Sequence, residues 1–301
     1  MRPLVLIEAP SNLGLKEPIP GVEPGVKFFP PAMEKEGFAA KAGIKTIVQV
    51  AAPKYDGIKD EETGVKNAAK IIEYSRKLAD TISAELNIER LPVVLGGDCS
   101  VLIGAALALK RSGRYGLFYL DGHTDYVLPH QSRTGGAAGM DLAMITGNGP
   151  VKFTNIQNQK PYIKEENVFC CGNRYIEEEW YVEAVKQSNI YYYDLFDMRD
   201  YGLSDLAETF LIHIASKDLQ GFWIHLDLDV LDDEIMPCVD SRNPDGLSYE
   251  ELKEILLPLL ESPLCAGINI TIFDPTLDTD GKYAERLADE LANIFKEISS
   301  E

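Results

Sequence analysis

The chain of 301 residues contains no Cys-x-x-Cys spacing, and its five cysteines are odd in number and scattered. Neither a disulfide framework nor a cysteine-based zinc site is therefore predicted. Long apolar runs are also missing: the run near the N-terminus, Leu4–Ile7, is too short for a signal peptide or a membrane span. We expect a cytoplasmic, reduced protein.

Positive charge is scarce as well. The sequence has 29 Lys and Arg against 48 Asp and Glu, which gives a formal net charge of −19. Such a balance argues against nucleic acid or an anionic membrane as partner, and a small-molecule substrate is expected instead. Most of the acidic side chains are expected to be solvated, but some are concentrated at particular places along the chain.

Short runs rich in Val, Ile, Leu and aromatic residues recur, and several are apolar on both faces, which is typical of a parallel sheet covered by helices on both sides. Apolar residues at helical spacing predict helices over Val65–Asn87 and Tyr283–Ile298, and Ser248 with Glu251 forms a capping box before another helix. No repeat or linker divides the chain, so we predict one doubly wound α/β domain over 1–301. The predicted strands are Pro3–Ala9, Lys45–Val50, Pro92–Leu95, Tyr115–Leu120, Asn167–Cys171, Ile190–Tyr193, Gly221–Asp229 and Cys265–Phe273.

Ligand-type side chains follow one of these strands directly. Asp121, His123 and Asp125 occupy alternate positions just past Tyr115–Leu120. If the extended backbone continues for a few residues, successive alternate side chains lie on one side, so the three side chains point the same way.

A second strand, Gly221–Asp229, places His225, Asp227 and Asp229 on one face by the same alternation. Two neighbouring carboxylates on a largely apolar strand are costly to bury unless a positive charge compensates them. Solvated acids or helix caps at a strand end are the alternative reading of either motif alone. Both motifs fall where open α/β sheets bind ligands, and carboxylates with one imidazole suit Mn²⁺, so a metal site is favoured.

A third motif, Gly96-Gly97-Asp98-Cys99-Ser100, lies between a strand and a helix. Glycines in such a turn let the backbone approach the occupant of the crevice, and Asp98 or Ser100 can cap the helix. Cys99 taken alone is more typical of a buried packing cysteine. The long glycine-bearing loop from Tyr126 to Pro150 is expected to be functional.

GGDCS, DGHTD and HLDLDVLDD, in this order and spacing, resemble the motifs GGDHS, DAHxD and SxDxDxxDP of the ureohydrolase family, which contains arginases, agmatinases and formimidoylglutamases. The resemblance covers nearly the whole chain. It implies a three-layer α/β/α fold with an eight-stranded, mainly parallel sheet, and a binuclear Mn²⁺ site. It also implies hydrolysis of a guanidine or amidine C–N bond by a metal-activated water, and a homo-oligomer.

The resemblance also implies the metal ligands. Asp121 and Asp227 would bridge two metals, His123 and Asp229 would complete one shell, and Asp125 would belong to the other. The remaining ligand of that second metal is a histidine in the family and Cys99 here. A thiol must deprotonate from a pKa of about 8.5, and its softness mismatches Mn²⁺. We therefore expect one tight Mn²⁺ and a second that is weak or absent.

Two further departures concern the substrate. The family's loop histidine, a proton shuttle in arginases, falls on Ala138, and the glutamate of DxxExNP that holds the guanidinium falls on Ile272. Isoleucine removes a charge-assisted contact to a cationic guanidinium. Ser132, Thr134 and Glu177 match positions that bind the amino acid part of the substrate, and we expect them, with Ile272, to line the substrate site.

His225 stands where the family has a serine. It is interpreted as an additional metal ligand, as an acid–base group, or as a histidine that hydrogen-bonds behind the ligands, and the sequence leaves these alternatives open. We assign His225 and Asp125 to the catalytic site. The predicted function is hydrolysis of a non-peptide C–N bond in a substrate other than simple arginine, and the alternative is a catalytically impaired homologue with a binding or regulatory role.

Overall fold

The computed structural model describes residues 2–175 and 179–299. Eight strands form one sheet in the order β2-β1-β3-β8-β7-β4-β5-β6, and every neighbouring pair is parallel. The strands are β1 (Leu4–Ala9), β2 (Thr46–Gln49), β3 (Leu91–Gly96), β4 (Tyr115–Leu120), β5 (Val168–Cys171), β6 (Tyr191–Tyr193), β7 (Gly221–Asp227) and β8 (Cys265–Thr271). The predicted parallel sheet is confirmed.

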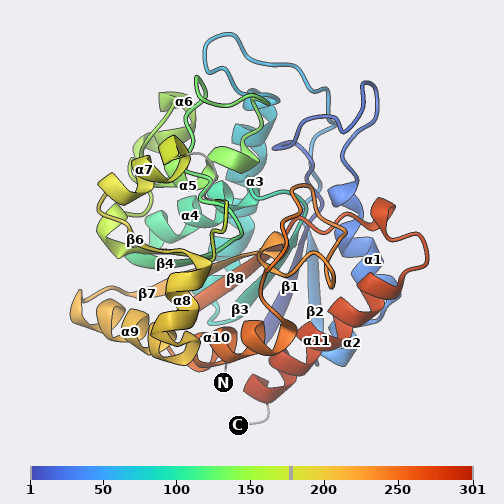
Figure 1. Ribbon diagram of the computed structural model, residues 1–301, viewed down its shortest axis with the longest axis vertical. Coiled ribbons are helices and arrows are strands. Elements are labelled where there is room, and N and C mark those ends of the chain that lie inside the picture. Colours follow the sequence, from blue (N-terminus) through green and yellow to red (C-terminus); the bar gives the residue numbers. More distant parts are fainter. Residues whose placement is uncertain (1, 176–178, 300–301) are drawn as a thin grey trace.

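Helices cover both faces of the sheet, which gives three layers (Figure 1). One face carries α1 (Phe29–Lys35), α2 (Phe38–Lys41), α8 (Leu195–Tyr201), α9 (Leu203–Ser216), α10 (Tyr249–Glu261) and α11 (Lys282–Ser299). The other carries α3 (Ala68–Asn87), α4 (Val101–Ser112), α5 (Asp141–Ile145), α6 (Val151–Thr154) and α7 (Glu179–Gln187). Short 3-10 turns are η1 (Gly25–Phe28), η2 (Ala138–Met140), η3 (Ile156–Asn158), η4 (Glu165–Asn167), η5 (Leu228–Val230) and η6 (Pro275–Leu277).

The sheet has a hydrophobic core on each side, which explains why its strands are apolar at successive positions. In β1, Val5 and Ile7 belong to the core beneath α3 and α4, whereas Leu6 belongs to the core beneath α10 and α11. All three side chains are buried. A strand covered on both faces has no solvent-facing positions, so alternation disappears.

The predicted helices agree closely with the structure. The helix predicted from Val65 begins at Ala68, because Asn67 has the left-handed φ of 53° and stands outside the helix. Ser248 and Glu251 form the predicted capping box at the start of α10. Among the described residues, no helix is both long and apolar enough to cross a membrane.

Two central strands end two residues earlier than predicted, and both ends matter for the site. Strand β7 ends at Asp227, whose carboxylate accepts the backbone N–H of Asp229 at 2.7 Å and starts the turn η5. Strand β8 ends at Thr271, and Ile272 has a φ of 81°. The chain therefore turns sharply beyond the carboxyl ends of both strands, at the centre of the sheet.

Candidate metal centre

A cavity of about 660 Å³ opens beyond the carboxyl ends of the four central strands, β3, β8, β7 and β4. Parallel strands end at the same edge of a sheet, so residues far apart in sequence meet there. The lining includes the predicted residues Cys99, His123, Asp125, Ser132, Thr134, Asp227, Asp229 and Ile272. Glu177 lies outside the described residues.

Two groups of ligand-type side chains meet at this edge, and Asp121 belongs to both. The first group is Cys99, Asp121, His225 and Asp227, and the second is Asp121, His123 and Asp229. Within each group the ligand atoms lie within 4.8 Å of one another. Adjacent groups that share a carboxylate have the arrangement needed for two neighbouring cations.

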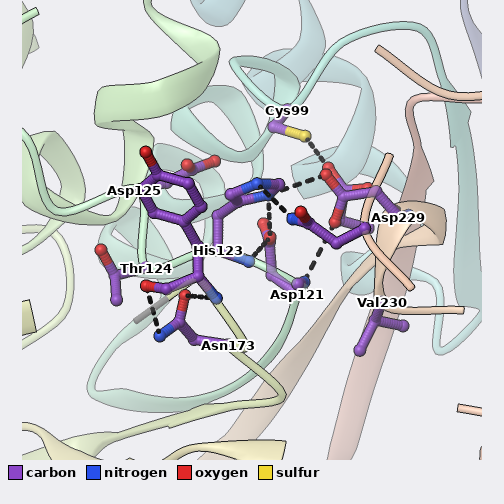
Figure 2. Close-up of polar contacts among 12 residues, drawn as sticks. Cys99, Asp121, His123, Thr124, Asp125, Asn173, Asp229 and Val230 are labelled. Carbon is purple, nitrogen blue, oxygen red and sulfur yellow. Dashed lines mark hydrogen bonds and ion pairs between the residues drawn. The ribbon is translucent and has the colours of Figure 1, made fainter. Parts of the chain in front are cut away.

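The second group is oriented by several hydrogen bonds. His123 Nδ1 lies 2.9 Å from Asp229 Oδ2, and the backbone N–H of His123 donates to Asp121 Oδ1 at 2.6 Å. Figure 2 shows these three side chains turned toward one another. Nε2 of His123 lies 3.3 Å from the side-chain nitrogen of Asn243. A partner on the far ring nitrogen fixes the ring orientation that a metal ligand requires.

Cys99 belongs to the first group and is buried. Its thiol donates to Asp227 Oδ2 at 2.6 Å and lies 3.3 Å from Thr271 Oγ1. Burial raises the pKa of Cys99 well above its usual range, and the nearby carboxylates of Asp227 and Asp121 raise it further. The sulfur is therefore held as a protonated donor in the absence of a cation.

Asp125 does not join either group. The extended backbone that the alternation argument assumed does not continue this far, because the chain bends after β4 and Asp125 has a φ of 43°. Its Oδ2 instead accepts from the hydroxyl of Tyr119 at 3.2 Å. The same hydroxyl lies 2.9 Å from Asp121 Oδ2 and 3.0 Å from Asp141 Oδ1. The assignment of Asp125 to a second metal stays a prediction.

The centre collects buried negative charge without enough positive charge to balance it. Burial, followed by repulsion from neighbouring carboxylates, raises the pKa of Asp125, Asp141 and Asp227 well above the ordinary value. Burial alone would lower the pKa of His123, but Asp229 and then Asp121 outweigh it and raise that pKa. The buried Oδ2 of Asp141 has no hydrogen-bond partner within the described part of the chain. Carboxylates around an imidazole fit a divalent cation such as Mn²⁺.

A family model described as the arginase family matches residues 6–295. The chain belongs to the arginase family. An arginase of Staphylococcus aureus strain COL is 28% identical over 97% of this chain and 96% of its own length. The structure of an arginase from Bacillus caldovelox matches with a TM-score of 0.86 and 25% identity over 98% of both chains. A formimidoylglutamase from Bacillus subtilis shares the fold, with a TM-score of 0.74 and 21% identity over 98% of this chain and 87% of its own.

The resemblance to ureohydrolases and the three-layer fold that it implied are thus confirmed. Within this arginase-family fold, the departures from the family motifs can be placed. Cys99, Ala138 and Ile272 all line the cavity, so all three face the space where a substrate would lie. Ile272 is only 4% exposed. A φ of 81° is a strained conformation for a β-branched residue, and such strain is often found at ligand sites.

Ser132 and Thr134 lie at the cavity wall in the loop after β4. Their hydroxyl oxygens are 3.4 Å apart, and Ser132 Oγ also accepts the backbone N–H of Gly135 at 3.0 Å. The loop therefore lines the cavity, as its length and glycines suggested. Gly97 serves another purpose than predicted: a Cβ there would lie 1.6 Å from the carbonyl oxygen of Ser11, so this glycine allows two backbone segments to pack.

Arg174 was not recognised from the sequence as part of the site. Its guanidinium is a hub of hydrogen bonds to backbone carbonyl oxygens, including Nη2 to Asp229 at 2.7 Å and to Asn243 at 2.8 Å. Further bonds reach the carbonyl oxygens of Val230, Leu231 and Pro244. Arg174 thereby holds the turn that carries one ligand against the loop that orients His123. The sequence analysis also did not identify Tyr119, Asp141 and Asn243 as site residues. Of these three, only Asp141 could have been noticed, because it is an acidic residue within an apolar segment.

Proposed function

We propose that this protein is a metal-dependent hydrolase that cleaves a non-peptide C–N bond in a linear amidine or guanidine-like substrate other than arginine itself. The observation that carries the proposal is the pair of ligand groups that share the buried Asp121 and whose members Cys99, His123, Asp227 and Asp229 line a cavity together with Ile272. The two groups provide the ligands for a metal ion, and Ile272 limits which substrates fit beside it. Membership of the arginase family supports the reaction class.

The proposed cofactor is Mn²⁺, with one tight site and a second that is weak or absent. Asp121, His123 and Asp229 form a compact group of carboxylate and imidazole ligands, which hard or borderline cations prefer, and Asp227 is proposed as the fourth ligand. A divalent cation held there supplies an activated water and an electrophile. The other group includes Cys99, whose thiol proton is donated in a hydrogen bond to Asp227 and must be lost before the sulfur can act as a strong ligand.

The residues of the chain perform the remaining tasks. Asp121 and Asp227 hold the cation with carboxylates that hydrogen bonds already orient. The backbone N–H of His123 donates to Asp121, and the backbone N–H of Asp229 donates to Asp227. Ser132 and Thr134 offer hydroxyl groups to the polar end of a substrate. Ile272 offers an apolar surface where arginases have a carboxylate, so an uncharged or more apolar group is favoured beside it.

We also propose a homo-oligomer acting on a small molecule in the cytoplasm. All five cysteines are free and buried, which supports a reduced environment. The net charge of −19 supports neither nucleic acid nor an anionic membrane as a partner.

A second candidate is a homologue of low activity that binds its ligand for a regulatory purpose. Ala138 supports it, because a methyl group at the cavity wall cannot transfer a proton to a leaving amine. The retained ligand groups favour the enzyme, since a regulator has no need of two acid-rich groups in a buried position. Retention of metal through purification without chelator, together with turnover of any C–N substrate, distinguishes the two.

The decisive test compares release of urea from arginine and agmatine, at saturating Mn²⁺ and mildly alkaline pH, with release of ammonia or amine from uncharged amidines and ureido compounds. We expect arginine and agmatine to react slowly, because the anchor and the proton donor are missing and acid–base help alone is worth about 10²–10⁴-fold. Ile272→Glu should lower KM for arginine, whereas the isosteric control Ile272→Gln should not. Turnover of arginine or agmatine many times per second by the wild type would overturn the proposed substrate class.

A further inference from the structure

Three residues stand side by side at the same level of the sheet, just below the metal ligands. In the register of the strands, Tyr119 on β4 pairs with His225 on β7, and His225 pairs with Asn269 on β8. The rings of Tyr119 and His225 stack with centroids 4.4 Å apart and planes 11° apart. All three are completely buried. His225 is therefore held between two neighbours and cannot rotate freely.

The orientation of the Asn269 amide follows from its other partner. Trp223, two residues before His225 on β7, donates its indole N–H to Asn269 Oδ1 at 2.8 Å. An indole nitrogen is a donor only, so the amide oxygen must face it. The amide nitrogen of Asn269 consequently faces His225 Nδ1 at 2.7 Å.

This orientation decides which nitrogen of His225 carries the proton. The amide nitrogen of Asn269 can only donate, so Nδ1 must accept and has no proton of its own. The ring proton is then on Nε2. Nε2 has no hydrogen-bond partner among the described residues and lies 3.7 Å from Asp121 Oδ2, beyond hydrogen-bond distance.

We propose that Trp223 and Asn269 fix the tautomer of His225, so that its Nε2–H is a hydrogen-bond donor to an oxygen atom in the centre and His225 is not a metal ligand. The inference rests on the proposed function, because it assumes that the centre holds a cation and an oxygen of water or substrate. A metal binds the nitrogen of an imidazole that lacks a proton. Close approach of Nε2 to Cys99, Asp121 and Asp227 therefore does not make it a ligand.

The consequence for the reaction is a donor on the buried side of the cavity. Ala138 at the cavity wall lacks the side chain that a loop histidine would provide, whereas His225 lies in the sheet beside Cys99 and Asp227, which line the cavity. His225 touches the reacting oxygen in this account, whereas Trp223 and Asn269 act through it and are positioning residues. An unpartnered buried N–H is costly, and an oxygen bound beside it removes that cost.

The test reads the tautomer directly. The protein is labelled with ¹⁵N in its histidines, of which there are four: His123, His130, His213 and His225. The signals that disappear in the variant His225→Gln are those of His225. Long-range ¹H–¹⁵N correlation spectra are recorded without metal and with the diamagnetic ion Zn²⁺. We expect Nε2 of His225 to be protonated and Nδ1 unprotonated in both states. A proton on Nδ1 in the wild type, or a metal on Nε2, overturns the proposal.

Two variants test the cause. Asn269→Asp keeps the bond to Trp223 but cannot donate, so Nδ1 of His225 should become protonated. Trp223→Phe releases the Asn269 amide, and both tautomers should appear; this variant decides the matter if Asn269→Asp does not fold. The control Asn173→Asp makes the same change at a buried asparagine that bonds Tyr192 at 2.7 Å, and should leave the tautomer unchanged. An unchanged His225 spectrum in both folded variants contradicts the assigned cause.

Metal binding separates this inference from the proposed function. Glutamine at position 225 also presents an N–H donor, so His225→Gln should bind Mn²⁺ almost as tightly as the wild type. Loss of a residue that only supports the ligands costs about 10- to 100-fold in metal affinity, so a loss of more than about 100-fold would identify His225 as a ligand and overturn the inference alone. Absence of metal binding in the wild type would instead overturn the proposed function.

Discussion

At the scale of single residues, the proposed number of cations in the centre depends on Cys99. Its thiol donates to Asp227 Oδ2, and burial with neighbouring carboxylates raises its pKa. The proton on sulfur and the metal compete for the same small space. A cation in the first ligand group must therefore displace a proton from a group that holds it firmly, and must accept a soft ligand in exchange.

The first prediction follows from this competition. Cys99→His should raise the Mn²⁺ content from nearer one to nearer two ions per chain, because an imidazole binds in its neutral form. Cys99→Ser is the control, since a hydroxyl keeps the donor to Asp227 without becoming a good ligand. Metal content is measured by plasma emission after removal of free ions. Two tightly held ions in the wild type would show that the thiol is an adequate ligand.

At the scale of elements, the site is built where β4, β7 and β8 end, and the sequence predicted those strands better than their ends. Successive apolar or aromatic residues, such as Leu117, Phe118 and Tyr119, predict a strand that is covered on both faces, and all three are buried in the structure. Hydrogen bonds formed just beyond the strands carry no comparable sequence pattern. Asp121 and His123 do meet as expected, but through a bend in which the backbone N–H of His123 donates to Asp121 Oδ1 at 2.6 Å.

At Asp125 the extended backbone that the alternation argument assumed is absent. Alternation holds only while the backbone stays extended, and Asp125 adopts a left-handed φ of 43°. Asp229 reaches the site through the turn η5 and not along β7. Asp141 and Arg174 could not be assigned from the sequence, because their roles depend on a shared tyrosine hydroxyl and on carbonyl groups from distant segments.

Arg174 gives the prediction that belongs to this scale. Arg174→Lys should lower the free energy of unfolding by about 2 kcal/mol, because an ammonium cannot reproduce the fork that bonds several carbonyl oxygens at once. Metal affinity should fall as well, since the turn bearing Asp229 loosens. Denaturant unfolding and calorimetry measure the two effects.

The matched control is Arg286→Lys, which alters an arginine that lies 3.6 Å from Glu290 at the protein surface. An exposed ion pair contributes less than about 1 kcal/mol, so this variant should change stability little and metal affinity not at all. Equal effects of the two substitutions would mean that Arg174 has no particular role in the centre.

At the scale of the whole molecule, the buried acids lead us to expect that metal binding stabilises the fold. A ligand that binds only the folded state stabilises it by about 2.7 kcal/mol at a concentration one hundred times its Kd. For a chain of this size we expect Tm to rise by roughly 5–10 °C when Mn²⁺ is added to chelator-treated protein. Differential scanning calorimetry measures the shift, and a Tm that does not depend on Mn²⁺ would contradict a metal centre in the folded protein.

The central claim is that Asp121, His123, Asp227 and Asp229 bind a divalent cation at the carboxyl ends of β4 and β7. Calorimetric titration of the chelator-treated protein with Mn²⁺ tests it most directly, using Asp227→Asn beside the control Asp233→Asn, which pairs with Arg242 outside both ligand groups. The account predicts a tight binding event in the wild type and in Asp233→Asn, and none in Asp227→Asn. Equal Mn²⁺ affinity in Asp227→Asn and the wild type would contradict the account.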